Sequence, residues 1–134
     1  YMDALGARRI PDPTTAGDFC RRFDATRIYC LQQIFNATRR KVWRQQPAAF
    51  FQEAILDADG TMVETTGERK EGMEINYKGQ WGYHALVLSL ANTGEPLFVV
   101  NRPGNRPSYE RAAWYFDRSI EFCRRSGFRK ILAP

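Results

Sequence analysis

The spacing of apolar residues changes along the chain, and the first part has the spacing of helices. Between residues 24 and 47, apolar side chains recur at steps of three and four, which places them on one face of a helix. Asp24 can cap the start of this helix, and Pro47 stops it. A shorter helix is expected before it, capped by Thr14 or Thr15 and ending near Phe23. The predicted buried stripe of the longer helix consists of Ile28, Leu31, Phe35, Thr38 and Val42.

From residue 54 onward, the pattern is that of strands. Residues 54–60 open with an apolar run, residues 83–90 are rich in strand-forming residues, and residues 97–101 form a third apolar segment. The polar residues 61–76 predict a loop, and residues 92–95 predict a hairpin turn. We therefore expect three antiparallel strands.

A last helix and the beginning of a fourth strand follow. Ser108 can cap the helix, and Gly127 is placed to end it in the left-handed conformation. Its predicted buried stripe comprises Ala112, Ala113, Phe116, Ile120 and Cys123. Residues 129–132 then begin a strand. Because a crossover helix returns the chain to a parallel strand, we expect this strand to run parallel to the first one.

These elements predict an α+β or α/β chain with a helical region, residues 1–50, and a sheet region, residues 51–134. The length of 134 residues suits one domain, or a domain with a small appendage. No apolar run approaches about 18 residues, so no membrane span is expected. The three cysteines form no C-x-x-C pair, which argues against a zinc or redox motif and favours reduced thiols in the cytoplasm. The chain begins with Tyr1 and not Met, which suggests a fragment.

Positive charge is concentrated in the helical region. Residues 1–50 carry the whole formal net charge of +5, because bases and acids are equal in number in residues 51–134. A basic helical region suggests an anionic partner such as nucleic acid, although a solvated surface is the equally balanced alternative. We place DNA binding in residues 14–46. The candidate phosphate contacts are Arg39, Arg40, Lys41 and Arg44.

Two carboxylates interrupt the first predicted strand. Side chains two residues apart in a strand point to the same face, so Asp57 and Asp59 would project together. Carboxylates at such a place need a partner, and a hard divalent cation such as magnesium is one. The alternative is that Asp59 and Gly60 form a turn that ends the strand.

The segments around this pair occur in a specific order. LDADGT spans residues 56–61, YKGQWGYH spans residues 77–84, and NRPGN spans residues 101–105. Together with IPDPTTAGDF at residues 10–19, they resemble the DDE transposases of bacterial insertion sequences over nearly the whole chain. The resemblance implies the start of a ribonuclease-H-like fold: three antiparallel strands, a crossover helix and a parallel fourth strand.

The resemblance also implies metal-dependent cleavage and strand transfer of DNA. In this family two Asp and one Glu hold two divalent ions. The first of these carboxylates matches Asp59, which is followed by Gly-Thr, and Asp57 is the second choice for the metal ligand. The cofactor would be Mg²⁺ or Mn²⁺, expected only for the complete protein. The partners would be double-stranded DNA, as transposon ends and target, and further copies of the full-length protein, in the bacterial cytoplasm at the nucleoid.

The sequence departs from the family where the fourth strand ends. The second Asp belongs just beyond it and the Glu on a later helix, but the chain stops at Pro134. We therefore expect a fragment of a transposase that is inactive alone, and whether it is an enzyme stays open. The alternatives are a non-catalytic DNA-binding module and another ribonuclease-H-like nuclease.

Other residues near the strands also have candidate roles. We expect Lys78 and Arg102, in turns beside the strands that flank Asp59, to contact phosphates. His84 is expected to pack and hydrogen-bond, with metal ligation or general-base chemistry as the alternative. Three aromatic residues are expected to pack in the core or at the sheet edge, with stacking on bases as the alternative: Tyr77, Trp81 and Tyr83.

Overall fold

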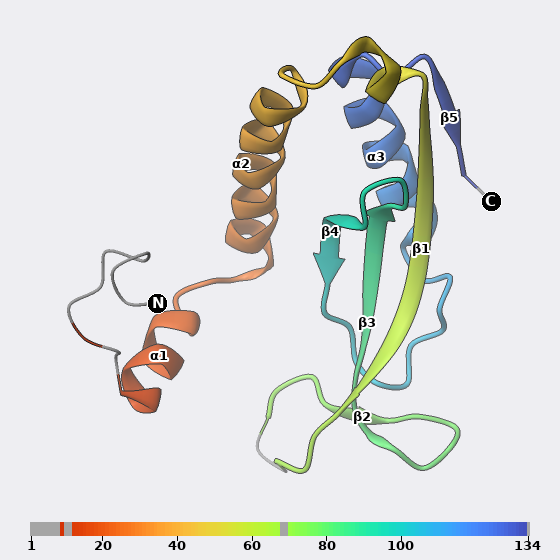
Figure 1. The fold of residues 1–134 in the computed structure, drawn as a ribbon. Coiled ribbons are helices and arrows are strands. Elements are labelled where there is room, and N and C mark those ends of the chain that lie inside the picture. The colour runs from red at the N-terminus through yellow and green to blue at the C-terminus, as the bar shows by residue number, and fades with distance from the viewer. Residues whose placement is uncertain (1–8, 10–11, 68–69, 134) are drawn as a thin grey trace. The chain divides into compact units, whose positions relative to one another are not determined.

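The computed structural model describes residue 9 and residues 12–67 and 70–133 of the chain (Figure 1). Two compact units divide it between Phe35 and Asn36, within helix α2 (Ala25–Trp43). The second half of α2 therefore belongs to the unit that contains the sheet. This division falls earlier in the chain than the boundary between residues 50 and 51 that the sequence suggested.

The first unit contains helix α1 (Pro13–Cys20) and the start of α2. Asp12 caps α1, because its Oδ1 accepts a hydrogen bond of 2.8 Å from the Thr14 amide. The hydrogen bonds from Thr14 lower the pKa of the Asp12 carboxyl. The prediction that Thr14 or Thr15 caps this helix was wrong, since Pro13 occupies the first helical position, which favours proline. Asp24 precedes α2 as predicted, and its Oδ1 accepts from the Arg27 amide at 2.8 Å.

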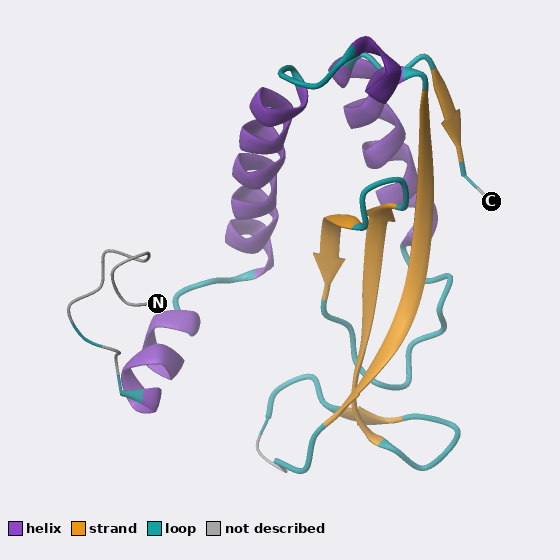
Figure 2. Ribbon diagram, viewed as in Figure 1, coloured by secondary structure: helices purple, strands orange, loops and turns teal. Residues whose placement is uncertain are grey.

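The second unit contains a mixed five-stranded sheet (Figure 2). Its central strands β1 and β3 pair antiparallel, β4 lies on the far side of β3, and β5 pairs with β1 in parallel. The predicted three antiparallel strands and parallel fourth strand are confirmed, and the short strand β2 is added to them. The strands are β1 (Glu53–Glu64), β2 (Glu74–Ile75), β3 (Trp81–Leu90), β4 (Glu95–Val100) and β5 (Lys130–Leu132).

One face of this sheet is buried against helix α3 (Ala112–Ser126). Successive side chains alternate between the two faces of a strand, and the alternate residues Leu86, Leu88 and Leu90 of β3 are buried. Leu56 of β1 is buried as well. The layered arrangement gives the unit a mixed α/β fold with its core between α3 and the sheet.

Helix α3 differs from its predicted form at its beginning. Arg111, with a φ of 61°, precedes it in the left-handed region, so Ser108 is not its cap. Its buried residues are Tyr115, Ser119 and Cys123, spaced by four. Of the predicted stripe, Cys123 is confirmed, whereas its other four members lie next to the buried positions or before them and are not fully buried. Gly127 ends the helix with a φ of 105°, as predicted.

An aromatic cluster joins the end of α2 to α3. The ring of Trp43 lies 5.3 Å from the rings of Phe122 and Phe128 and 5.8 Å from Phe50, which belongs to the 3₁₀ helix η2 (Ala48–Phe51). Val42, predicted to be buried, is instead 53% exposed. The face of α2 that packs in this unit therefore carries Trp43 and polar residues.

No helix among the described residues has both the length and the apolar character that crossing a membrane requires.

Candidate functional site

Asp57 and Asp59 lie on the solvent-exposed face of β1. The strand continues without a break through Gly60 and Thr61 to Glu64, so the alternative of a turn after Asp59 is wrong. Asp57 pairs across the sheet with Ser89, and Asp59 pairs with Val87. Thr61, on the same face, donates a hydrogen bond of 3.1 Å from its hydroxyl to Asp59 Oδ2. The two carboxylates thus share one face, as predicted.

These carboxylates supply only part of a metal site. Hard cations take six or more oxygen ligands, and two monodentate carboxylates provide too few. Within the described ranges, no group of three or more His, Cys, Asp or Glu side chains could hold a metal ion. The donor chemistry of Asp57 and Asp59 suits magnesium, but a complete site needs ligands from elsewhere.

The four basic residues predicted to bind DNA differ in their surroundings. Arg39 is directed toward β4, and its side chain is only 15% exposed. Arg40 is half-buried, while Lys41 and Arg44 are exposed. All four belong to the last turns of α2 or follow it directly, where positive charge also matches the negative end of the helix dipole. Lys41 and Arg44 are therefore the best exposed of the four candidates.

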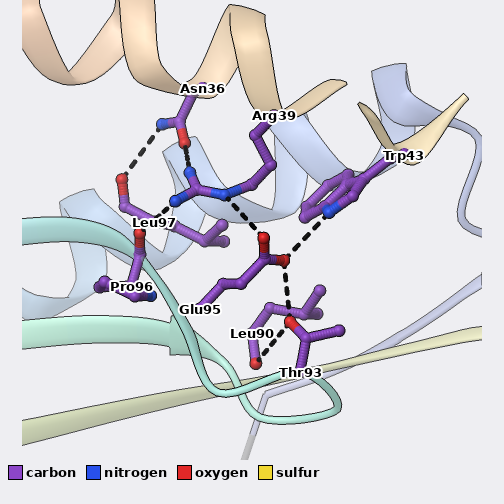
Figure 3. A network of polar contacts seen from close by, with 8 residues as sticks. All are labelled: Asn36, Arg39, Trp43, Leu90, Thr93, Glu95, Pro96 and Leu97. Atoms are coloured by element: carbon purple, nitrogen blue, oxygen red, sulfur yellow. Dashed lines mark hydrogen bonds and ion pairs between the residues drawn. The ribbon is translucent and has the colours of Figure 1, made fainter. Parts of the chain in front are cut away.

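Arg39 belongs to a polar network that fastens the end of α2 to the hairpin between β3 and β4 (Figure 3). Its Nη2 donates to the Pro96 carbonyl at 2.8 Å, and its Nε lies 3.5 Å from Glu95 Oε1. Glu95 Oε2 accepts 3.0 Å from the Trp43 indole and 2.8 Å from the Thr93 hydroxyl. Asn36, which is buried, donates to the Leu97 carbonyl at 3.1 Å and accepts from Arg39. The contacts give Arg39 a structural role.

Arg102 is buried and donates hydrogen bonds to backbone carbonyls, so it is not an exposed cation. Its side chain is 3% exposed, and desolvation lowers its pKa, with Glu110 opposing that effect. Its Nε donates to the His84 carbonyl at 2.9 Å, and its Nη1 lies within 3.2 Å of the carbonyls of Pro107, Ser108 and Glu110. Its Nη2 makes no hydrogen bond, but this atom is buried, so a phosphate could reach it only if the covering segment moved. The geometry disfavours the predicted phosphate contact and assigns the residue to holding the segment after β4 against β3.

Lys78 lies in the tight turn between β2 and β3. Asn76 Oδ1 accepts from the amides of Lys78 at 2.9 Å and Gln80 at 3.0 Å, and Gly79 has a φ of 80°, which favours glycine. The turn presents Tyr77, whose side chain is 93% exposed. Lys78 Nζ lies 5.5 Å from the centroid of that ring. The predicted packing of Tyr77 under the sheet was therefore wrong.

An open cleft of about 770 Å³ separates this turn from the loop after β4. The turn of residues 76–80 forms one wall, and residues 104–108 form the other. Gly60, Met62 and His84 line it from β1 and β3. Residues alternate between the two faces of a strand, so Gly60 lies on the same face of β1 as Ala58. Asp57 and Asp59 lie on the opposite face.

His84 and Ser108 converge above Gly60. A Cβ on Gly60 would stand 2.9 Å from His84 Nε2 and 3.2 Å from the Ser108 hydroxyl. His84 Nδ1 lies 2.8 Å from the Arg106 carbonyl, which can only accept, so Nδ1 carries the hydrogen and Nε2 is left toward the cleft. The predicted hydrogen-bonding role of His84 is confirmed.

Two glycines allow close backbone approaches near the cleft: Gly104 between the loop after β4 and β2, and Gly82 between β3 and β1. A Cβ on Gly104 would lie 2.3 Å from the Glu74 carbonyl oxygen, and one on Gly82 would lie 2.1 Å from that of Val63. Neither distance is compatible with a side chain. Gly82 and Gly104 belong to the GYH and NRPGN segments, so backbone packing explains glycine at these places.

Sequence reasoning did not identify Gly60, Arg106 or Ser108 as parts of a cleft. They come from segments far apart in the chain. They are brought together by the pairing of β1 with β3 and by the hydrogen bonds of Arg102. The one signal that could have indicated a cleft was the density of glycine, amide and basic residues in the YKGQ and RPGNRPS segments.

Comparison with known proteins yields no relative for this chain. No protein-family model matches it, and searches of curated proteins and of solved structures give no significant match.

Proposed function

We propose that this chain is the N-terminal part and first catalytic segment of a DDE-type DNA transposase with a ribonuclease-H-like fold. The observation that carries the proposal is the position of Asp57 and Asp59 on the exposed face of β1, with antiparallel β3 on one side and parallel β5 on the other. The segments quoted from the sequence supply the resemblance to that class.

The register of β5 supports the same proposal. Ile55 of β1 pairs with Leu132 of β5 in parallel. A strand that continued beyond Leu132 in this register would run beside Asp57 and Asp59. The second Asp of the family belongs just past this strand, so in a longer protein its carboxylate would come close to this pair.

The chemistry assigned to this face is hydrolysis and transfer of a phosphodiester. Divalent magnesium or manganese, when bound, would supply activation of the attacking oxygen and stabilisation of the leaving oxygen. Asp59 and Asp57 would hold the ion on this side, and the Thr61 hydroxyl would orient Asp59 through its hydrogen bond. The remaining ligands would come from other parts of a longer protein.

Binding of double-stranded DNA is the second part of the proposal. Phosphate contacts would come from Arg40, Lys41 and Arg44, whereas Arg39 is held by Glu95 and Pro96. The proposal also includes action on transposon ends and target DNA, self-association of the full-length protein, and a location at the bacterial nucleoid.

The catalytic part is tested in a protein that extends this chain through the missing carboxylates. Asp59→Asn should remove magnesium-dependent strand cleavage and leave DNA binding unchanged. The matched control is Asp117→Asn, since Asp117 is an exposed carboxylate on α3. Cleavage that survives Asp59→Asn, or is abolished equally in the control, would contradict the assignment.

The DNA-binding part is tested on the chain itself. Replacing Arg40, Lys41 and Arg44 together by Gln should reduce the slope of log affinity against log salt by about 0.9 for each phosphate that the protein no longer contacts on duplex DNA. The control replaces three exposed bases elsewhere by Gln: Arg118 and Arg124 of α3, and Arg129 just before β5. An equal reduction in both triple variants would show that only net charge matters.

A non-catalytic DNA-binding module is the second candidate function. The observation that favours it is the incomplete carboxylate set in the described part of the chain. It predicts salt-dependent binding to any duplex DNA, with no cleavage by the extended protein. Cleavage in the extended protein distinguishes the two functions.

A further inference from the structure

The cleft between the β2–β3 turn and the loop after β4 has the features of a nucleotide site. Its volume, about 770 Å³, lies within the range of roughly 300–1,000 Å³ that small-molecule sites occupy. Both walls are fixed by hydrogen bonds: Asn76 closes the turn, and Arg102 holds the loop. The turn that forms one wall follows β2, at the end of the sheet where β2 pairs with the beginning of β3 (Figure 1).

The charge of the cleft has one sign. Lys78 and Arg106 line it, and none of its lining residues is a carboxylate. Arg106 has a long contact of 3.7 Å with Glu110, outside the lining, in which both side chains are partly exposed. Such pairs contribute little, so Arg106 can turn toward an anion at small cost. The cleft therefore favours an anionic ligand.

A hydroxyl group at its floor suits a phosphate. The Ser108 hydroxyl lies above Gly60, and Gly60 leaves the space in which a phosphate oxygen can accept from it. The neighbouring His84 Nε2 carries a lone pair and accepts only from a donor group of a ligand. Amide side chains on the other wall are already engaged, since Asn76 donates to Gln80 at 2.8 Å. Among the neutral groups above Gly60, the Ser108 hydroxyl is thus the one that can donate to a phosphate.

Tyr77 supplies an aromatic surface at the same cleft. Its ring is 93% exposed although exposure of a large aromatic surface is unfavourable, and the hydrogen-bonded turn holds it in place. Bases of single strands stack on such rings, whereas bases of a duplex are already stacked on one another. An exposed ring in a cleft that two cations line is the kind of arrangement that single-strand sites use.

We infer that this cleft binds one nucleotide of a single-stranded nucleic acid. Its phosphate would lie against Lys78, Arg106 and Ser108, and its base would stack on Tyr77. The inference does not rest on transposition, because the cleft opens on the opposite face of β1 from Asp57 and Asp59. A free nucleotide shares the same chemistry, so the experiment has to separate the two sources.

The test uses the full chain and a single-stranded octamer of thymidylate, followed by amide signals in ¹H–¹⁵N spectra and by fluorescence anisotropy. We expect the octamer to shift the signals of Gly60, Lys78 and Ser108. Thymidine 5′-monophosphate and inorganic phosphate form two further arms. Saturable shifts of these signals by the octamer, at concentrations where the monophosphate gives none, identify a strand as the ligand. Equal affinity for the monophosphate would assign the site to free nucleotides instead and overturn the strand proposal.

Variants at the aromatic ring separate stacking from charge. Base stacking contributes about 1–3 kcal/mol per base, so Tyr77→Leu should weaken octamer binding by roughly five- to 150-fold. Tyr77→Phe should retain binding. Tyr109→Leu is the matched control, because Tyr109 is 81% exposed and lies outside the cleft lining. Equal effects of Tyr77→Leu and Tyr109→Leu would refute the inference.

Two further variants test the floor and the charge. Gly60→Ala would force the His84 ring to move without any change of charge, and it should reduce octamer binding while binding of duplex DNA is retained. Lys78→Gln with Arg106→Gln should lower the salt slope by about 0.7 for each phosphate that the protein no longer contacts on a single strand. Arg124→Gln is the control, an exposed base at the end of α3. The site would be contradicted if the double variant kept the salt slope of the unchanged chain and Gly60→Ala kept its affinity for the octamer.

Discussion

Replacement of Glu95 by Gln should loosen the end of α2 from the sheet. The Glu95 carboxylate accepts from the Trp43 indole at 3.0 Å and from Thr93 at 2.8 Å, and it faces Arg39 at 3.5 Å. Hydrogen bonds to a charged group contribute about 1.5–3 kcal/mol each when partly buried. Glutamine keeps the size of the side chain, but it replaces one accepting oxygen by a donor that faces other donors.

We expect Glu95→Gln to lower the free energy of unfolding by about 2 kcal/mol, allowing for the partial exposure of the carboxylate. For a unit of this size, each kcal/mol corresponds to roughly 4–8 °C in melting temperature. The control is Glu121→Gln, whose ion pairs with Arg118 and Arg125 on α3 are exposed. That change should cost less than about 0.5 kcal/mol.

A double-mutant cycle of Glu95→Ala with Trp43→Phe isolates the bond to the indole. Each single variant removes this hydrogen bond, so their combined effect should fall short of the sum by about 1 kcal/mol. Urea unfolding measures the four free energies, and the Trp43 indole signal in NMR spectra reports the bond directly. Additive effects within about 0.3 kcal/mol, or an equal cost for Glu121→Gln, would refute the view that this network holds the helix.

Four further outcomes follow from buried groups. Arg102→Met should destabilise the chain by about 3 kcal/mol or more in urea unfolding, because several carbonyls lose their donor, and an unchanged stability would restore a surface role for Arg102. Gly104→Ala should cost about 2 kcal/mol or more through its clash with a backbone carbonyl, whereas Gly17→Ala in α1 should be neutral or stabilising, as thermal melting can measure. Burial raises the pKa of the Cys123 thiol to about 12, so a thiol reagent should modify Cys20 and Cys30 in the folded chain and Cys123 only after unfolding. Since the unfolded chain loses that proton near pH 9, stability should fall as pH rises from about 9 toward 12.

The sheet was predictable because its signals are local. Apolar runs and turn residues located β1, β3 and β4, and the preference for right-handed crossovers gave the direction of β5. The end of β1 was misplaced, since Asp59 and Gly60 have the composition of a turn. Pairing with β3 overrides this local preference, because Gly60 lies directly opposite Leu86.

The roles of the arginines were beyond sequence reasoning. A basic residue in a helix or turn is normally exposed, and nothing near Arg39 or Arg102 in the chain reveals its acceptors. Those acceptors are the Glu95 carboxylate and carbonyls that become neighbours only through folding. Burial and pairing are tertiary properties, so periodicity and composition do not report them.

The most direct test of the central proposal is Mn²⁺ titration of the chain, followed by paramagnetic broadening of its amide signals. If Asp59 and Asp57 form one side of a metal site, low millimolar Mn²⁺ should first broaden the signals of Ala58, Thr61 and Val87, which neighbour the pair in β1 and across the sheet. Asp59→Asn should abolish this selectivity, and Asp117→Asn should leave it intact. Two results would contradict the assignment of this face to metal-dependent chemistry. One is broadening at Asp57 and Asp59 that is no stronger than at Asp117, and the other is broadening that Asp59→Asn leaves unchanged.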